Sequence, residues 1–461
     1  MRVFSETANA VVSRLRDYQL AGAAFLTERS GALLADEMGL GKTVQCVVAL
    51  ETTLARIDGA ARALVITPAA LQLNWLAEIN KWAPAIHAQL LRGNAHDRGA
   101  TLALPIPVIL ATYEQIRMSI LAGGVQTVFD IVVLDEAQRI KNPDSSTSIA
   151  CRLLRRHRSW ALTGTPVENC LDDLYTIYDF VKPGLLLRTM SLRNMHQRIL
   201  PHFLRRRKQD VLPELPPIHT QDLRIELTPA QRRTYDDLYI EATTSLKSQS
   251  ADDMNMLALL TRLKVVCNID PATQESAKLD ALQVFLDGAI GDRTKVLVFS
   301  QFVSTLEYLA DRIEYPPTHL YHGGMNSTER DAALARFKQG SGPRVLLMSI
   351  RAGGVGLNLP EADTVVLFDR WWNPAVENQA VHRAHRFGRQ SPLFVIRFLA
   401  EDTVESRIND VLQRKARLFA TAVDGISGAA TGLTKTDLLA ILSIWTDESI
   451  PQGKGVDDVT D

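Results

Sequence analysis

Short apolar runs alternate with longer stretches of helical periodicity along most of this chain. Each run is rich in Val, Ile and Leu, has the length of a strand buried on both faces, and is followed by polar or turn residues. The early runs are GALLA (31–35), ALVIT (63–67), PVILAT (107–112), DIVVLD (130–135) and WALTG (160–164). The later runs are KVLVFS (295–300), RVLLMS (344–349), TVVLFD (364–369) and LFVIRFL (393–399). This alternation predicts two α/β lobes, each a parallel sheet covered by helices.

The pattern of apolar residues changes between the two sets of runs. Residues 186–275 carry no comparable strand run and indicate helical segments, broken by the proline-rich LPELPPIHT at 212–220. After the second set, Asp402 and Glu405 resemble a capping box at the start of a helix, which we expect to fold back across the lobes as a brace. We therefore predict four regions: a first lobe over 1–185, a helical linker or protrusion over 186–275, a second lobe over 276–420, and a C-terminal helix and disordered tail over 421–461.

Length, charge and cysteine content narrow the class of protein. The 461 residues predict two to four domains. Because 51 basic residues balance 52 acidic ones, overall charge gives no support for a nucleic-acid partner, and that inference depends on local basic clusters. The four scattered cysteines indicate a reducing compartment. The longest apolar stretch, at 102–111, is too short to span a bilayer, so we expect a soluble intracellular protein without a membrane partner.

The segment GALLADEMGLGKTVQ at 31–45 places glycines directly after a predicted strand and before a predicted helix. Gly39 and Gly41 allow a tight turn whose backbone N–H groups point at an anion, and the helix adds its positive N-terminal end. Lys42 would reach the β- and γ-phosphates, and the Thr43 hydroxyl would bind Mg²⁺. Asp36 stands where the strict pattern has its first glycine, and we include it with the nucleotide-binding residues. The alternative is a chance glycine turn.

The run DIVVLDEAQ supplies the complementary half of such a site. A carboxylate at the C-terminal edge of a parallel sheet lies where ligands bind. Asp135 can hold Mg²⁺ from the side opposite Thr43, and Glu136 can orient and deprotonate an attacking water. Two surface acids after a strand are the alternative reading, which the GKT motif makes a poor one.

These and further motifs make the chain resemble the Swi/Snf-type DNA-dependent ATPases of helicase superfamily two, over about residues 15 to 420. The motifs occur in the order of that family: LRDYQ, DEMGLGKT, ALVITPAAL, ILATYE, DEAQRIKN, LTGTPVEN, LRRRKQDVLPELP, VLVFSQF, YHGGM, SIRAGGVGLNL, DRWWNP and QAVHRAHRFGR. The resemblance implies two RecA-like lobes, ATP and Mg²⁺ as cofactors, and double-stranded DNA as a partner of a monomeric core, with protein partners left open. It implies a cytoplasmic, nucleoid-associated protein in a prokaryote or phage host, or a nuclear one in a eukaryote.

The resemblance also implies roles for residues that match the family's motifs. These are Gln19 for the adenine edge, Thr163 and Thr165 for coupling the nucleotide site to the DNA path, Gly354 and Gly356 for close backbone approach to ATP or DNA, and Arg383 and Arg386 as arginine fingers from the second lobe. Fixed guanidinium groups stabilise the negative charge that develops on the γ-phosphoryl oxygens. Hydrolysis would then require the lobes to close.

Three features leave alternatives open. Gln138 stands where the family usually has His, so its coupling to the LTGTP loop is uncertain although an amide can still hydrogen-bond. The LRRRK cluster, with Arg205 and Arg206, is either a solvated helix end or a DNA-facing or lobe-bridging segment. In DRWWNP, Arg370 is a DNA-backbone or lobe-interface candidate, and Trp371 either stacks on bases or packs at a lobe edge.

The leading hypothesis is an ATP-driven translocase that tracks double-stranded DNA and remodels protein–DNA complexes. A second hypothesis is a nucleotide-gated subunit of a larger complex, for example in phage defence or transcription. A third is a strand-separating helicase, which the branch-specific motifs disfavour.

Overall fold

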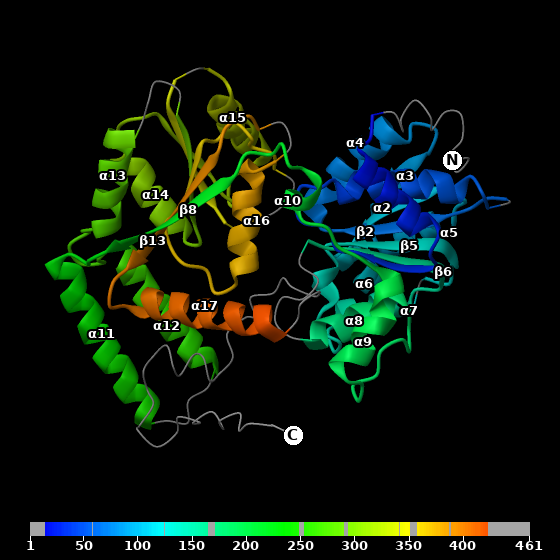
Figure 1. Ribbon diagram of the computed structural model, residues 1–461, viewed down its shortest axis with the longest axis horizontal. Helices are drawn as coiled ribbons and strands as arrows, with labels where there is room; N and C mark the ends of the chain where they lie inside the picture. The colour runs from blue at the N-terminus through cyan, green and yellow to red at the C-terminus, as the bar shows by residue number, and fades with distance from the viewer. Residues whose placement is uncertain are drawn as a thin grey trace, which may run out of the picture.

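The computed structural model describes residues 14–57, 59–123, 125–164, 171–248, 253–289, 294–340, 342–350, 357–386 and 389–422. They form two lobes side by side, the N-terminal lobe on the right of Figure 1 and the C-terminal lobe on the left. Each lobe is built on one sheet whose described strand pairs are all parallel. The predicted pair of parallel-sheet α/β lobes is confirmed.

The first sheet has the strand order β3-β4-β2-β5-β6-β1-β7. Its strands are β1 (Gly31–Leu34), β2 (Ala63–Thr67), β3 (Ala88–Leu90), β4 (Val108–Thr112), β5 (Phe129–Asp135), β6 (Arg156–Leu162) and β7 (Phe203–Leu204). The central strands are buried on both faces, because alternate side chains of one strand enter different cores. Leu33 joins the core on one side of the sheet, whereas Ala32 and Leu34 join the core on the other.

Helices cover both faces of this sheet. One face carries α2 (Asp17–Thr27), α3 (Lys42–Leu54) and α4 (Gln72–Trp82). The other carries α5 (Ala95–Ala103), α6 (Tyr113–Leu121), α7 (Ser146–Leu153), α8 (Leu171–Val181) and α9 (Leu192–Ile199). Helix α6 begins directly after β4 because Thr112 and Gln115 form a capping box, with the Thr112 hydroxyl accepting from Gln115 N at 3.1 Å. Because the strands are parallel, the loops at their carboxyl ends lie along one edge of the sheet.

The second sheet has the order β10-β11-β9-β12-β13-β8. Its strands are β8 (Ile218–Ile225), β9 (Lys295–Ser300), β10 (Thr318–Tyr321), β11 (Arg344–Ser349), β12 (Thr364–Leu367) and β13 (Leu393–Ala400). Helices α13 (Ala277–Ala289) and α14 (Val303–Arg312) pack on one face, and α15 (Ser327–Lys338) and α16 (Pro374–Ala384) on the other. A separate core joins α11 (Pro229–Ser248), α12 (Asp253–Asn268) and α17 (Val404–Ala422) below the sheet in Figure 1.

The expectation that residues 186–275 hold no strands is wrong. Strand β7 extends the first sheet beside β1, and β8 pairs with β13 along its full length. Strand β8 escaped detection because it is an edge strand: of its eight residues only Ile225 is buried, so its sequence has no apolar run. The chain therefore leaves the first sheet at Leu204 and enters the second at Ile218, and α10 (Lys208–Val211) lies between the lobes in Figure 1.

Helix α17 starts where expected but is capped differently. The Thr403 hydroxyl accepts a hydrogen bond from Glu405 N at 3.1 Å, and Asp402 has a left-handed backbone. The Glu405 carboxylate does not close a capping box, because it forms a buried ion pair with Lys278 instead. The helix packs on α12 and runs along the lower edge of the second lobe toward the first in Figure 1. The predicted tail beyond residue 422 lies outside the described residues.

Candidate functional site

The phosphate-binding loop predicted at residues 36–43 joins β1 to α3. Gly39 and Gly41 have left-handed φ values of 87° and 74°, and α3 begins at Lys42 immediately afterwards. A Cβ on Gly41 would lie 2.7 Å from Gln19 Nε2, so a larger residue would meet both backbone strain and a steric clash. The loop therefore requires glycine, and it presents backbone N–H groups at a helix N-terminus.

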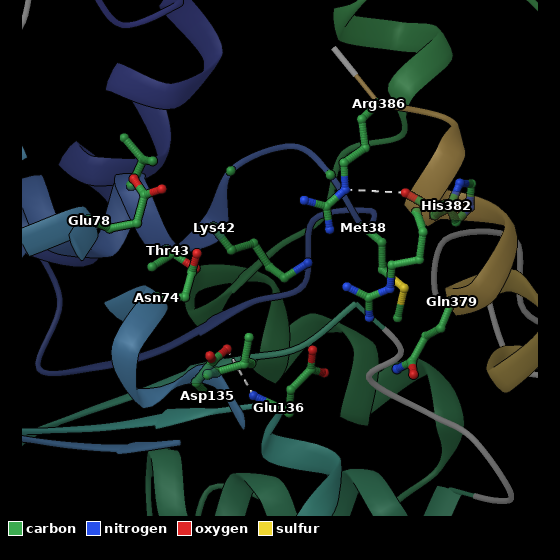
Figure 2. Close-up of a pocket in the computed structure, with 15 residues that line it drawn as sticks. Met38, Lys42, Thr43, Asn74, Glu78, Asp135, Glu136, Gln379, His382 and Arg386 are labelled. Carbon is green, nitrogen blue, oxygen red and sulfur yellow. Dashed lines mark hydrogen bonds between the residues drawn. The ribbon is translucent and has the colours of Figure 1, made fainter. Parts of the chain in front are cut away.

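Lys42 projects from this loop into a pocket (Figure 2). Its Nζ donates a hydrogen bond to the backbone carbonyl of Asp36 at 2.8 Å. Burial lowers the pKa of Lys42, while Glu136, Asp36 and Asp135 oppose that shift. A half-buried lysine that lines the pocket and lies among acidic groups stays charged and is suited to receive an anionic ligand.

Asp135 is the last residue of the central strand β5, Glu136 follows it, and both line the same pocket. The Asp135 carboxylate accepts hydrogen bonds from Trp75 Nε1 at 2.6 Å, from the Thr67 hydroxyl at 3.3 Å and from Glu136 N at 3.0 Å. Burial and the neighbouring Glu136 nevertheless raise the pKa of Asp135 to about 6. Glu136 has φ 53°, a left-handed conformation that is uncommon for a non-glycine residue and is often found at functional sites.

Gln138 connects Glu136 to the end of the neighbouring strand β6. Its Nε2 donates to Glu136 Oε2 at 2.7 Å, and its Oε1 accepts from the Thr163 hydroxyl at 2.7 Å. Both hydrogen bonds match the chemistry of the amide, because its N–H donates to a carboxylate and its oxygen accepts from a hydroxyl. Gln138 and Thr163 are thus brought together as a bridge beside the pocket.

The second lobe closes the pocket from the opposite side. Arg383 on α16 and Arg386 just beyond it line the same pocket as Lys42 and Glu136, together with Gln379 and His382 (Figure 2). Burial lowers the pKa of Arg383 to about 10, with Arg386 acting in the same direction and Glu136 against it. The side chain of Arg386 also lies against the phosphate loop, 3.5 Å from where a Cβ on Gly39 would stand.

The donor set in this pocket fits a magnesium–nucleoside triphosphate. Gly39 and Gly41 hold the loop in a left-handed turn at the start of α3, and Lys42 supplies a half-buried cation beside it. Thr43 and Asp135 offer one hydroxyl and one carboxylate oxygen. The described residues contain no cluster of three or more His, Cys, Asp or Glu side chains able to hold a metal. That pattern suits Mg²⁺, which proteins bind through one or two side chains together with substrate phosphates and water.

Two predicted nucleotide ligands do not line the pocket. The Asp36 carboxylate is fully buried and is held by Arg206, whose Nε donates to it at 3.0 Å, and by Gln45 at 3.1 Å. Only the backbone carbonyl of Asp36 reaches Lys42. Gln19 lies behind the loop, with its Nε2 3.4 Å from the Leu40 carbonyl. Both residues contact the loop without lining the pocket.

Three residues predicted as DNA or interlobe contacts are held by other parts of the protein. Besides Asp36, the Arg206 guanidinium donates to the Tyr18 carbonyl and to Gln45. It therefore faces the interior of the first lobe, where it holds the residue at the start of the phosphate loop. Arg370 is 3% exposed and pairs with Glu377 on α16. Trp371 packs against the core of the second lobe.

Arg205 is half-buried, and burial lowers its pKa. Thr165, Gly354 and Gly356, which were predicted to couple or contact ATP or DNA, lie outside the described residues.

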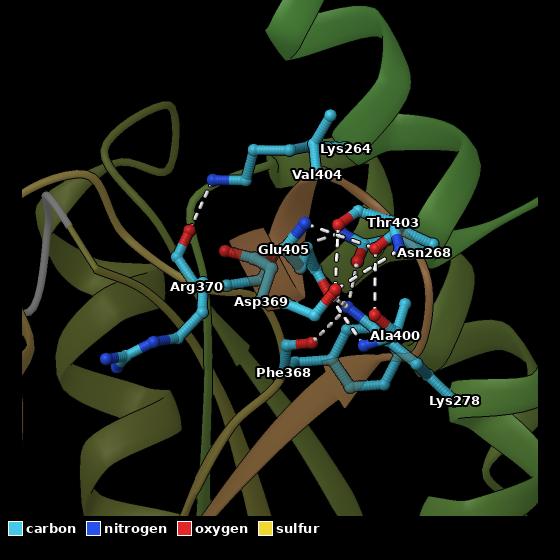
Figure 3. A network of polar contacts seen from close by, with 12 residues as sticks. Lys264, Asn268, Lys278, Phe368, Asp369, Arg370, Ala400, Thr403, Val404 and Glu405 are labelled. Atoms are coloured by element: carbon cyan, nitrogen blue, oxygen red, sulfur yellow. Dashed lines mark hydrogen bonds and ion pairs between the residues drawn. The ribbon is translucent and has the colours of Figure 1, made fainter. Parts of the chain in front are cut away.

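A buried polar network holds α16 in the second lobe (Figure 3). Lys278 Nζ lies 2.7 Å from Glu405 and donates to Asn268 Oδ1 at 3.0 Å and to the Phe368 carbonyl at 2.9 Å. Lys264 donates to the Arg370 carbonyl, and Arg370 in turn pairs with Glu377 of α16. The network thereby ties α17, α12 and α13 to the helix that carries Arg383.

Sequence reasoning missed several residues of the site. They are Thr67 and Trp75, which hold Asp135, the pocket-lining Met38, Asn74, Glu78, Gln379 and His382, and the interlobe residues Glu37 and Lys208. Thr67 ends a predicted strand beside DIVVLD, so the shared carboxyl edge of the two strands was a usable signal. For Trp75 and His382 the sequence carries no local signal.

The fold and pocket define a two-lobe protein with a phosphate-binding loop between its lobes. The SNF2-related domain model matches residues 18–191, and the helicase conserved C-terminal domain model matches residues 277–388. The chain belongs to the Swi/Snf-type branch of helicase-like ATPases. No helix among the described residues is long and apolar enough to cross a membrane.

Individual relatives are similar over nearly the whole of this chain. An uncharacterized ATP-dependent helicase of Mycoplasma pneumoniae is 34% identical over 458 residues, covering 93% of this chain and 44% of the relative. Chromodomain-helicase-DNA-binding protein 1 of Gallus gallus is 29% identical, covering 96% of this chain and 29% of that protein. The chain thus spans less than half the length of these relatives. The Sulfolobus solfataricus SWI2/SNF2 ATPase core in complex with dsDNA is 28% identical, covers 93% of this chain and 97% of that one, and has a TM-score of 0.43.

Proposed function

We propose that this chain hydrolyses ATP in the pocket between its lobes and uses the hydrolytic cycle to move along double-stranded DNA. The observation that carries the proposal is the meeting of two lobes at one pocket: Arg383 and Arg386 come from the second lobe, and Lys42 and Glu136 from the first. Charge that develops on a γ-phosphoryl group would then be stabilised by cations from both sides.

Each pocket residue has a role that fits its surroundings. Lys42 and the loop N–H groups bind the phosphates, and Thr43 and Asp135 would hold Mg²⁺, which neutralises phosphate charge when bound. Glu136 orients and deprotonates the attacking water. Gln138 holds the Glu136 carboxylate in place through the 2.7 Å hydrogen bond. The arginine pair stabilises the transition-state charge.

The division of the site between lobes supplies a means of movement. Because the arginines and Lys42 belong to different lobes, the complete site exists only when the lobes are closed. Hydrolysis and product release remove the anion that the two sets of cations share, and the lobes can then separate. If both lobes hold the same DNA strand, each closing and opening advances one lobe along it.

Duplex DNA as the track is supported by the relatives. Their names include ATP-dependent helicase and chromodomain-helicase-DNA-binding protein. We expect most contacts to be made with phosphates, so that binding is poorly sequence-specific and weakens as salt increases. We expect the surface that contacts DNA to consist of residues other than Arg206 and Arg370, since both guanidinium groups are bonded within the protein.

The test is the steady-state ATPase rate against duplex, single-stranded and forked DNA at a low and a high salt concentration. We expect duplex DNA to raise the rate steeply and high salt to reduce that stimulation. Lys42→Ala is the control for contaminating ATPases and should be inactive. A rate that duplex DNA leaves unchanged would contradict the proposal, and separation of the forked strands would favour a helicase instead.

A further inference from the structure

The segment between the lobes is fastened to both of them at Lys208. The backbone N–H of Lys208 donates to Glu37 Oε2 at 2.8 Å, which ties it to the phosphate loop of the first lobe. Its Nζ lies 3.0 Å from His382 Nδ1 and donates to the His385 carbonyl at 2.6 Å, which ties it to α16 and the turn that follows. The side chain is 3% exposed, although Lys is rarely buried without partners.

His382 completes a direct link between the lobes. Its Nε2 lies 3.4 Å from Glu37 Oε1, while its Nδ1 faces Lys208. With Lys208 charged, only one form of the imidazole serves both neighbours: a neutral ring with the proton on Nε2 donates to Glu37 and accepts from Lys208. Burial, and Lys208 after it, lowers the pKa of His382 well below its usual value, so the ring is neutral as this geometry requires.

We call Glu37, Lys208 and His382 the interlobe clasp. It contacts the phosphate loop directly, because Lys208 Cε lies 3.2 Å from where a Cβ on Gly39 would stand. It is also anchored to the linker beyond α10, since His385 Nε2 lies 2.8 Å from the Pro216 carbonyl. Phosphate loop, linker and arginine helix therefore meet at one buried point, and residues about 170 positions apart in sequence depend on one another there.

We propose that Lys208 is a positioning residue that, through His382 and Glu37, sets the arginine-bearing end of α16 against the phosphate loop. The inference rests on the proposed ATP hydrolysis at this pocket. Arg383 is the next residue after His382, and Arg386 Nε donates to the His382 carbonyl at 3.2 Å, so fixing His382 fixes both arginines. Lys208 itself does not line the pocket among the described residues, and it acts on catalysis only through its neighbours.

Substitutions of matched size separate this role from simple packing. His382→Gln keeps one acceptor and one donor on a neutral side chain, whereas His382→Leu removes both at similar size. Lys208→Met likewise keeps the length of the side chain and removes its donors. We expect kcat to fall by roughly 10- to 100-fold in His382→Leu and Lys208→Met, because small displacements of catalytic groups have effects of that order. His382→Gln should recover most of the activity that His382→Leu loses, because a neutral amide restores one donor and one acceptor.

Nucleotide affinity distinguishes positioning from direct binding. It is measured by titrating a fluorescent ATP analogue into each variant in a Glu136→Gln background, which blocks hydrolysis. We expect the affinity to change less than about threefold while kcat falls, because the phosphate loop itself is intact. Unchanged kcat in Lys208→Met overturns the proposal. A loss of affinity that parallels the loss of kcat also overturns it, since the clasp residues would then be nucleotide ligands.

A structural readout keeps the clasp testable apart from the ATPase. Fluorescent labels on Asn80→Cys of α4 and Thr328→Cys of α15, both exposed positions, report the distance between the lobes by energy transfer in the full chain. Lys208→Met should lower the fraction of closed molecules. If the wild type hydrolyses no ATP, the proposed function fails, and this shift still tests the clasp. No shift in any clasp variant would show that the linker does not hold the lobes together.

Discussion

The Thr163 hydroxyl donates a hydrogen bond to Gln138 Oε1 over 2.7 Å, and Gln138 Nε2 donates in turn to the Glu136 carboxylate. The end of β6 is thereby connected to the carboxylate proposed to activate water. Sequence comparison within the motif left this connection uncertain, because glutamine stands in place of the usual histidine. The amide serves as well as an imidazole would, since it offers one donor and one acceptor on opposite sides.

This bridge predicts that Gln138 and Thr163 act as a unit. Gln138→Leu and Thr163→Val should each lower the DNA-stimulated kcat about five- to tenfold, as expected for the loss of a hydrogen bond worth about 1 kcal/mol. Nucleotide affinity should be unaffected. The double variant should be no slower than Gln138→Leu alone, and additive losses in this double-mutant cycle would contradict a shared pathway.

Arg386 should be needed for turnover and not for binding. Because an arginine that stabilises transition-state charge contributes roughly 10³- to 10⁵-fold, Arg386→Ala should reduce kcat by at least about 10³-fold. Affinity for a fluorescent ATP analogue should remain within about threefold of the wild type. Arg336→Ala, which removes an exposed arginine of α15 in the same lobe, is the control and should be fully active. Substantial residual turnover in Arg386→Ala would argue against its role.

Binding of the magnesium–nucleotide complex should depend on pH through Asp135. The pKa of this carboxyl is raised from 3.8 to about 6, so the folded protein holds an extra proton between those values and the associated stability is lost as pH rises through about 6. Since Asp135 would bind Mg²⁺ in its ionised form, affinity for the magnesium–nucleotide complex should increase over the same range. Calorimetric titrations of the wild type with Mg²⁺ and a non-hydrolysable ATP analogue, between about pH 5 and about pH 7.5, would measure this.

Trp75 provides an internal check on that assignment. Its hydrogen bond to Asp135 lowers the pKa of the carboxyl, opposing the effect of burial. Trp75→Phe keeps the aromatic volume and removes the donor, so the midpoint of the pH dependence should move upward. A midpoint that stays in place would show that Asp135 is not the titrating group.

The ion pair between Lys278 and Glu405 should dominate the stability of the second lobe. Both side chains are fully buried, so Lys278→Ala leaves an uncompensated carboxylate and should reduce the free energy of unfolding by about 3–5 kcal/mol. The paired variant Lys278→Met with Glu405→Leu should be much less destabilised, because no charge is left buried alone. Urea unfolding followed by circular dichroism gives both values. A loss under about 1 kcal/mol in Lys278→Ala would contradict the expectation.

The sequence by itself determined the two parallel sheets and the phosphate site. Central strands such as β2 and β9 are buried on both faces, so they are written as continuous apolar runs and were found with their observed bounds. Gly39, Gly41 and Lys42 also form a local pattern, since the loop and the start of α3 depend on adjacent residues. The edge strand β8 has one exposed face and carries no such run.

Only the tertiary structure decided which distant side chains meet. A run of arginines has the same sequence whether it faces solvent or the interior. In the folded chain Arg206 donates to the Asp36 carboxylate, 170 positions away. The approach of Arg386 to the phosphate loop, and the convergence of Glu37, Lys208 and His382, likewise depend on how the two sheets are set against each other. Local patterns record local conformation, whereas contacts between lobes are fixed by the burial of surfaces that lie far apart along the chain.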